Sequence, residues 1–150
     1  MRRTDRQITE ADALAVLDKG EYGVLSTISS DGSPYSVPVN YCLLNGSIYF
    51  HSTLTGTKVD NLVRDPRVSF CVIGDTEILP SQFATRYESC IVRGQATEVF
   101  EDEKQAALEG LLAKYSADFM AEGLRYIESQ TDKTRVFRIS ADEVDGKARR

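Results

Sequence analysis

Apolar and polar residues alternate along much of the first half of the chain, which predicts strands separated by tight turns. Asp31-Gly32 and Asn45-Gly46 are dipeptides typical of two-residue β-hairpins. They separate three predicted strands, Tyr22–Ser29, Pro34–Leu44 and Ser47–Ser52. The pattern therefore predicts an antiparallel meander at the start of the fold.

Strand-like patterns return in the second half of the chain, between segments of other character. Three further strands are predicted at Arg67–Ile73, Tyr87–Val99 and Thr134–Ser140. Gly94 inside the second of them indicates a bulge or a close approach of another backbone. We expect Gly74–Ala84, which contains Pro80, to be a loop, and Lys147–Arg150 to be a charged tail.

Helical periodicity is confined to a few segments. Thr9 is expected to cap a short helix that Gly20 ends. Further helices are predicted at Thr55–Arg64, Glu101–Tyr115 and Phe119–Ile127. Six strands and few helices indicate a mainly β fold with flanking helices, specifically a small antiparallel barrel. Because no linker or repeat interrupts the pattern, residues 1–150 are read as a single domain.

Composition narrows the function classes. The 150 residues carry a net charge of −5 and form no basic stripe, which disfavours nucleic-acid binding. No apolar run is long enough to span a membrane and no secretory signal is recognisable, so a cytoplasmic location is expected. Cys42, Cys71 and Cys90 show no metal-site spacing and are read as buried, reduced thiols. A single histidine excludes multi-histidine metal sites, and no metal is predicted.

The strand predicted at Pro34–Leu44 has two unlike faces. One face is apolar and consists of Tyr35, Val37, Val39, Tyr41 and Leu43. The other face is smaller and more polar, and consists of Ser36, Pro38, Asn40, Cys42 and Leu44. Pro38 lacks the N–H that a fully paired strand needs, so it indicates a strand edge. That edge is open either to a flat ligand or to water alone.

A corner between a strand and a helix follows at residues 51–58. The N-terminus of a helix offers free N–H groups and partial positive charge, which suit a phosphate. Gly56 allows close approach, and Lys58 adds a full positive charge. Hydroxyl donors come from Ser52, Thr53, Thr55 and Thr57. A threonine cap beside a solvated lysine is the alternative interpretation. His51, directly before the corner, is a donor or base near a ligand, or else a barrel histidine satisfied by its neighbours.

The order of these motifs resembles the pyridoxamine-phosphate-oxidase-like flavin split barrels. The resemblance covers about residues 6–147, and within that superfamily it is strongest to the nitroimidazole-resistance (Nim-type) proteins. It is carried by Pro34-Tyr35-Ser36-Val37-Pro38-Val39-Asn40, Ile48-Tyr49-Phe50-His51-Ser52, Gly56-Thr57-Lys58-Val59-Asp60-Asn61-Leu62, Asp65-Pro66-Arg67-Val68 and Tyr87-Glu88-Ser89 followed by Gly94.

The resemblance implies a six-stranded FMN-binding split barrel that forms a homodimer, with two FMN sites at the subunit interface. The backbone of Val37, Pro38, Val39 and Asn40 would face the flavin ring. His51, Ser52, Thr57 and Lys58 would line the ribityl-phosphate end, and Ser89 and Tyr87 would add flavin contacts. Thr57 stands where the vitamin-forming oxidases have an arginine, so pyridoxamine phosphate is not the expected substrate.

The function that the resemblance implies is FMN-dependent reduction of a small, flat molecule, such as a nitroaromatic compound. His51 would be the catalytic residue, with a proton-donor role as a hypothesis. The alternatives are a non-catalytic flavin- or haem-binding protein of the same fold, a user of deazaflavin, or a structural dimer with an empty cleft.

Overall fold

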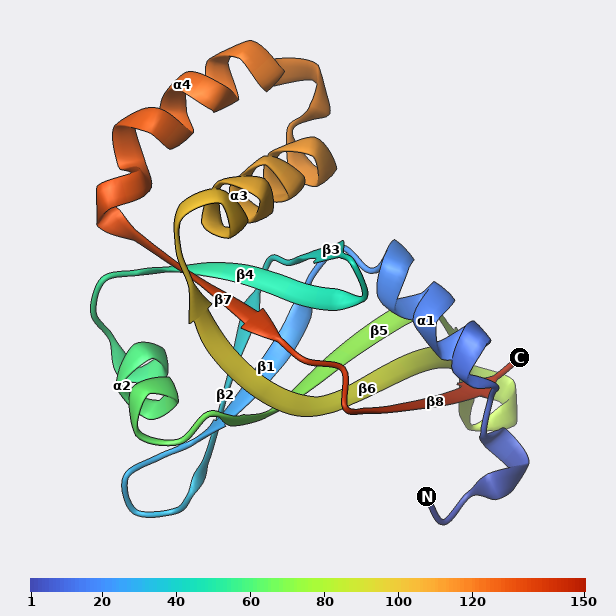
Figure 1. Ribbon diagram of the computed structural model, residues 1–150. Coiled ribbons are helices and arrows are strands. Elements are labelled where there is room, and N and C mark those ends of the chain that lie inside the picture. Colours follow the sequence, from blue (N-terminus) through green and yellow to red (C-terminus); the bar gives the residue numbers. More distant parts are fainter.

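The computed structural model describes residues 1–150 and consists of a curled antiparallel sheet with helices around it (Figure 1). The strands are β1 (Gly23–Ile28), β2 (Pro34–Val39), β3 (Cys42–Leu44), β4 (Ser47–Thr53), β5 (Arg67–Leu79), β6 (Ala84–Val99), β7 (Thr134–Ile139) and β8 (Glu143–Arg149). The helices are α1 (Glu10–Lys19), α2 (Thr57–Arg64), α3 (Glu101–Tyr115) and α4 (Met120–Gln130).

Seven strands follow one another in the order β2-β1-β5-β6-β7-β4-β3, and β8 pairs separately with β6. The sheet curls into a half-barrel, so the predicted split barrel is confirmed, although with more strands than the six expected. All pairings are antiparallel. Both early hairpins form, and Gly32, Asn45 and Gly46 adopt the positive φ angles that such tight turns need.

The predicted strand Pro34–Leu44 is wrong in one respect, because it is divided in the structure. β2 ends at Val39 and β3 begins at Cys42, so Asn40 and Tyr41 lie outside both ladders. The alternation still holds on the apolar face, where Val39 and Tyr41 are buried. On the other face Cys42 is buried beneath α3 rather than exposed with Pro38.

Helix α1 begins and ends where the sequence predicts. The side chain of Thr9 accepts a hydrogen bond of 3.1 Å from the Asp12 N–H, which caps the helix. Gly20 ends the helix in an extended conformation with φ −62°, not in the left-handed one. Glycine is needed there for space, because a Cβ would overlap the Tyr41 hydroxyl and Val72.

Two segments that were expected to be irregular are strands. Most of Gly74–Ala84 continues the β5–β6 hairpin, and only Pro80–Gln82 forms a 3-10 turn at its tip. The register shifts between Ile73 and Thr76, where Glu88 accepts a 3.0 Å hydrogen bond from the Asp75 N–H. The predicted tail Lys147–Arg150 belongs mostly to β8, which extends the sheet along the outer part of β6.

Two hydrophobic clusters stabilise the fold. The larger cluster fills the curl of the sheet and includes Leu25, Phe50, Phe70 and Ile139. The smaller cluster lies under α3 and includes Leu111. No cysteine forms a disulfide: Cys42 and Cys90 are buried, as predicted, whereas Cys71 is partly exposed. Burial raises the pKa of the Cys42 and Cys90 thiols to about 11, so both are protonated and unreactive near neutral pH.

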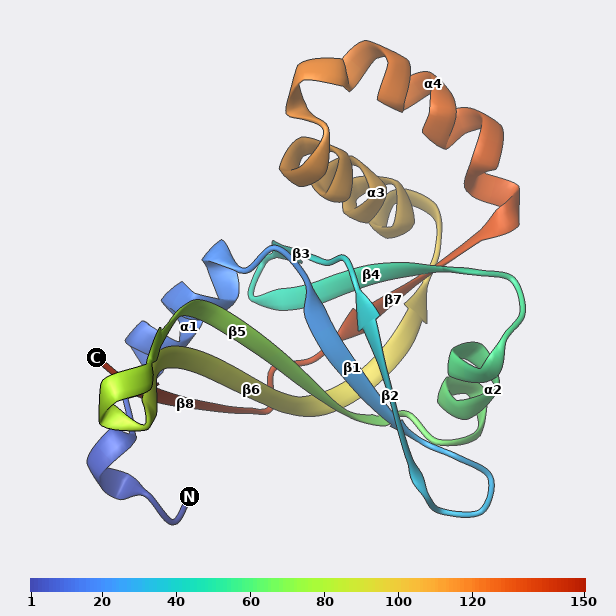
Figure 2. The same cartoon turned by 180° about the vertical axis from the view of Figure 1, so that it is seen from behind.

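Helices α3 and α4 form a hairpin inserted between β6 and β7, and Figures 1 and 2 show it standing on one side of the sheet. α3 packs on β3, β4 and β7, whereas α4 packs mainly on α3. Gly123 permits this contact, because a Cβ there would overlap the side chain of Leu112. None of the helices is long and apolar enough to cross a membrane.

Gly94 marks the point at which β6 changes partners. Residues before it pair with β8 and residues after it pair with β7. The chain between β7 and β8 passes directly over this point, and the Ser140 N–H donates a 3.0 Å hydrogen bond to the Gln95 carbonyl. A Cβ at Gly94 would overlap the Ser140 carbonyl oxygen. The predicted close approach is therefore confirmed.

We expect Gly94→Ala to lower the free energy of unfolding by about 3 kcal/mol, because the added methyl group meets backbone that cannot rotate away. Urea unfolding monitored by circular dichroism measures the change. Gln95→Ala is the matched control, since Gln95 is the exposed neighbour and only its backbone holds Ser140. A loss below about 1 kcal/mol for Gly94→Ala would show that the chain at Ser140 can move away and does not require glycine at position 94.

Candidate functional site

Strands β2 and β4 and helix α2 surround an open groove of about 600 Å³. Its lining consists of Tyr22, Pro38, Val39, Asn40, His51 and Lys58. Five of these six residues are candidates predicted from the sequence. They come from three separate elements, so only the tertiary fold brings them together.

Strand β2 forms one wall of the groove and is the last strand of the sheet. It pairs with β1 alone, with Pro38 opposite Val24. Pro38 and Asn40 are exposed, which confirms that the proline occupies a free strand edge. Val37 points the other way and packs against the core, so only its backbone is available to a ligand.

Lys58 lies in the first turn of α2 as a half-buried cation without a partner. It makes no salt bridge and no side-chain hydrogen bond, and its Nζ lies 5.8 Å from the centroid of the Phe50 ring. Burial lowers the pKa of Lys58 below its usual value, because the charged form loses hydration. A positive charge in this state favours an anion beside it.

The N-terminus of α2 is also without a cap. The helix begins at Thr57 rather than Thr55, and the capping position is Gly56, with φ 141° and no side-chain hydrogen bond. Thr53 donates its hydroxyl to the Thr55 carbonyl instead of capping the helix. The alternative of a threonine cap is therefore wrong, and the first N–H groups of α2 remain free for another acceptor.

His51 lies in β4, opposite Val136. Its imidazole makes no hydrogen bond within the chain, and Ser52 beside it is buried. The side chain is exposed on the wall of the groove, but the protein packed around its base still reduces its hydration. This desolvation lowers the pKa of His51, and the nearby charge of Lys58 lowers it further. The imidazole is consequently neutral near physiological pH.

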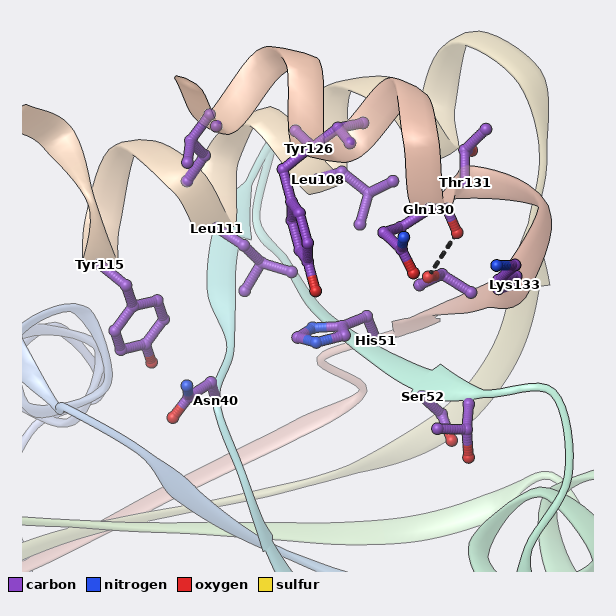
Figure 3. A pocket seen from close by; sticks show the side chains of 15 residues that line it. Asn40, His51, Ser52, Leu108, Leu111, Tyr115, Tyr126, Gln130, Thr131 and Lys133 are labelled. Carbon is purple, nitrogen blue, oxygen red and sulfur yellow. Dashed lines mark hydrogen bonds between the residues drawn. The ribbon is translucent and has the colours of Figure 1, made fainter. Parts of the chain in front are cut away.

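A second hollow, of about 380 Å³, lies beneath α3 and α4 (Figure 3). Asn40 and His51 line both hollows. Ser52, a predicted site residue, and Thr53 also line this hollow and not the groove. The other walls come from residues that the sequence did not single out for a site, among them Leu108, Leu111, Tyr126, Gln130 and Lys133. The helical spacing of Leu108 and Leu111 was a visible signal, but it predicts a packing face and not a cavity.

Besides Val37, four predicted residues do not line the groove: Ser52, Thr57, Tyr87 and Ser89. Tyr87 and Ser89 belong to the β5–β6–β8 end of the sheet, which Figures 1 and 2 show on the opposite side from α2. There the Ser89 hydroxyl donates a 3.3 Å hydrogen bond to the Lys147 carbonyl. Thr57 is exposed at the start of α2 and does not line the groove. The groove of one copy of the chain is thus lined by only some of the cofactor-binding residues predicted from the sequence.

Because His51 is the single histidine, its titration can be followed by NMR without assignment. We expect a pKa below its ordinary value of 6.5, and a higher pKa in Lys58→Met, since that variant removes the repelling charge. Folding therefore disfavours the proton on His51. Stability should fall as the pH decreases through 6.5 towards the folded pKa, and His51→Gln should lack this part of the loss. An unchanged His51 pKa in Lys58→Met would contradict the predicted coupling.

Comparison with known proteins agrees with this architecture. A crystal structure of a candidate 5-nitroimidazole antibiotic resistance protein from Bacteroides thetaiotaomicron superimposes with a TM-score of 0.77 at 22% identity, over 94% of this chain and 85% of that one. A conserved hypothetical protein from Mycobacterium tuberculosis gives 0.83 at 23% identity, over 99% and 89%. The FAD and heme binding protein of Mycobacterium smegmatis gives 0.80 at 19% identity, over 95% and 73%.

At identities this low, the superpositions establish that these proteins share the fold of this chain. No curated protein sequence matches the chain significantly. The family model described as pyridoxamine 5'-phosphate oxidase, however, matches residues 9–148, which is nearly the whole chain. The chain therefore belongs to the pyridoxamine 5'-phosphate oxidase family.

Proposed function

We propose that this protein binds FMN in the groove and acts as a homodimeric, FMN-dependent oxidoreductase on a small, flat molecule such as a nitroaromatic compound. The observation that carries the proposal is Lys58, a half-buried ammonium without a counter-ion beside the uncapped N-terminus of α2. A phosphate group supplies the missing negative charge, and the free N–H groups of the helix supply its hydrogen bonds.

The shape of the groove fits the rest of such a cofactor. Pro38, Val39 and Asn40 form an exposed edge along which a flat ring system lies without competing for ladder hydrogen bonds. Thr57, exposed at the start of α2, would supply a further hydroxyl donor from outside the groove, whereas Ser52 is buried and faces the second hollow. When bound, FMN would supply electron transfer from an external donor to the acceptor, while the protein supplies position and hydrogen bonds.

His51 stands where its imidazole reaches both the groove and the second hollow. Desolvation, and to a smaller extent the charge of Lys58, lowers its pKa, so His51 is neutral in the free protein and accepts a proton poorly. A phosphate dianion beside Lys58 cancels that repulsion and raises the affinity of His51 for a proton. In the proposed role, His51 holds this proton on an imidazole nitrogen and delivers it to the acceptor.

FMN binding is tested by the visible spectrum of the purified protein and by mass spectrometry of the cofactor released by acid. We expect Lys58→Met to bind FMN about 10- to 100-fold more weakly, because one charge-assisted contact is lost. Lys58→Arg keeps the charge and is the control. If Lys58→Met retains the affinity of the native protein, the phosphate does not bind at this corner. A colourless protein that cannot be reconstituted with FMN would refute the proposal.

The homodimer is supported by an exposed apolar face on the β5–β6 hairpin. Cys71, Ile73, Ser89 and Ile91 alternate with buried neighbours and so share this outer face; Ile73 is 60% and Ile91 40% exposed. Exposed apolar surface of this kind marks interfaces. Ser89 lies within this face and away from Lys58 of its own chain, so it would reach a flavin only across such an interface.

We expect Ile91→Asp to shift the protein from dimer to monomer, because a carboxylate would be buried without a partner. Analytical ultracentrifugation at several concentrations measures the shift. Phe119→Asp is the control, since Phe119 is 64% exposed on the distant α3–α4 connection. A native protein that is monomeric at micromolar concentration would contradict the dimer.

A binding function without catalysis is a second candidate, which the unpartnered imidazole of His51 favours. A neutral imidazole is a ligand for haem iron, and the Mycobacterium smegmatis neighbour is named for binding both FAD and heme. Titration of the purified protein with haem separates the candidates. A haem spectrum that is lost in His51→Ala, together with no flavin binding, would favour this second function.

A further inference from the structure

The hollow beneath α3 and α4 is distinct from the groove that would hold the cofactor. The two share Asn40 and His51 but have otherwise different walls. In Figure 3 the ring of Tyr126 descends from α4 towards His51, and Leu108 and Leu111 lie behind it. A molecule in this hollow would therefore contact His51, which the groove also reaches.

The walls of the hollow are those of a small-molecule site. Its upper part is apolar and is formed by Leu108, Leu111, Tyr126 and Ile127. Its volume of about 380 Å³ is at the low end of the range for ligand pockets, about 300–1,000 Å³, so it suits a molecule of one or two rings. Polar side chains line the lower part and one end of the hollow, and among them Gln130 would help to fix the orientation of such a molecule.

The charges around the hollow restrict what it can accept. Its fifteen lining residues include Lys133 but no aspartate or glutamate. Lys133 forms no salt bridge, and Lys104 holds the segment before it through a 2.8 Å hydrogen bond to the Thr131 carbonyl. An anionic or uncharged ligand is therefore favoured over a cationic one.

We propose that this hollow binds the electron acceptor as an uncharged or anionic aromatic molecule of one or two rings, so that the α3–α4 hairpin sets substrate specificity. The role of the ligand as electron acceptor rests on the proposed function, because it requires a flavin in the groove. The binding of an aromatic ligand in the hollow does not depend on it. Binding of an aromatic ligand here is measurable with or without flavin.

The probes are 4-nitrobenzoate and 4-nitrobenzylamine, which share a nitrophenyl ring and carry opposite charges. Isothermal titration calorimetry of the purified protein, as isolated, should show tighter binding of 4-nitrobenzoate. Gln130→Trp should weaken this binding at least about tenfold, because the indole occupies the hollow. Ser129→Trp is the matched control, since Ser129 is the exposed neighbour on α4 and does not line the hollow.

Lys133→Glu is a second variant, which reverses the one fixed positive charge in the lining without placing a ring in the hollow. It should reduce the preference for 4-nitrobenzoate over 4-nitrobenzylamine by about two- to fivefold, as expected for a partly solvated charge. Thermal unfolding confirms that each variant is folded. Equal binding in Gln130→Trp and the native protein, or a preference for the amine, would overturn the proposal.

Titration with FMN separates this inference from the proposed function. We expect Gln130→Trp to keep the FMN affinity of the native protein while it loses 4-nitrobenzoate binding. A protein that binds 4-nitrobenzoate in this hollow but never binds FMN would refute the proposed function and leave the inference intact. A protein that binds FMN but gives no Gln130-dependent binding of 4-nitrobenzoate would refute the inference and leave the proposed function intact.

Discussion

The anchoring of Tyr41 is the constraint on which the site depends. Tyr41 is fully buried at the break between β2 and β3, and its hydroxyl donates a 2.5 Å hydrogen bond to the Leu17 carbonyl at the end of α1. Its backbone, which has no ladder partner, is held by α3: Lys114 donates to the Tyr41 carbonyl at 2.9 Å, and the Tyr115 hydroxyl accepts from the Tyr41 N–H at 3.1 Å.

This anchor determines where Asn40 lies. With Tyr41 fixed on the core side, the preceding side chain must point outwards, between the groove and the hollow beneath α3. Lys114 also lies 3.6 Å from the centroid of the Tyr41 ring, so the same residues connect α1, the strand break and the inserted hairpin. The position of α3 and the geometry of both hollows are consequently coupled.

The electrostatics of the site follow from burial more than from ion pairing. Several charges of the chain are paired, as in the contact of 2.6 Å between the partly buried Arg135 and Glu98. Lys58 and His51 are different, because both lose hydration and neither has an acidic neighbour. Two adjacent basic groups in this state are unfavourable for the empty protein and favourable for an anionic ligand, which is why the site is expected to bind phosphate before it does any chemistry.

The sequence by itself determined the features that depend on neighbouring residues. The hairpin dipeptides, the Thr9 cap, the proline at a strand edge and the order of strand, corner and helix around His51 and Lys58 are all readable locally. Gly94 was also correctly identified as a close approach. Each of these rests on a backbone angle, a missing N–H or a missing Cβ, which is a property of the residue itself.

Only the tertiary structure decided the features that need a distant partner. Gly74–Ala84 contains turn-forming residues and Lys147–Arg150 is highly charged, yet both extend strands because β6 offers them a ladder. The division of Pro34–Leu44 depends on α3, and the hollow beneath α4 exists only because the inserted hairpin stands over β4. Local patterns predict what a segment prefers, but hydrogen bonds between strands far apart in the sequence and the space left between packed elements follow from the complete fold.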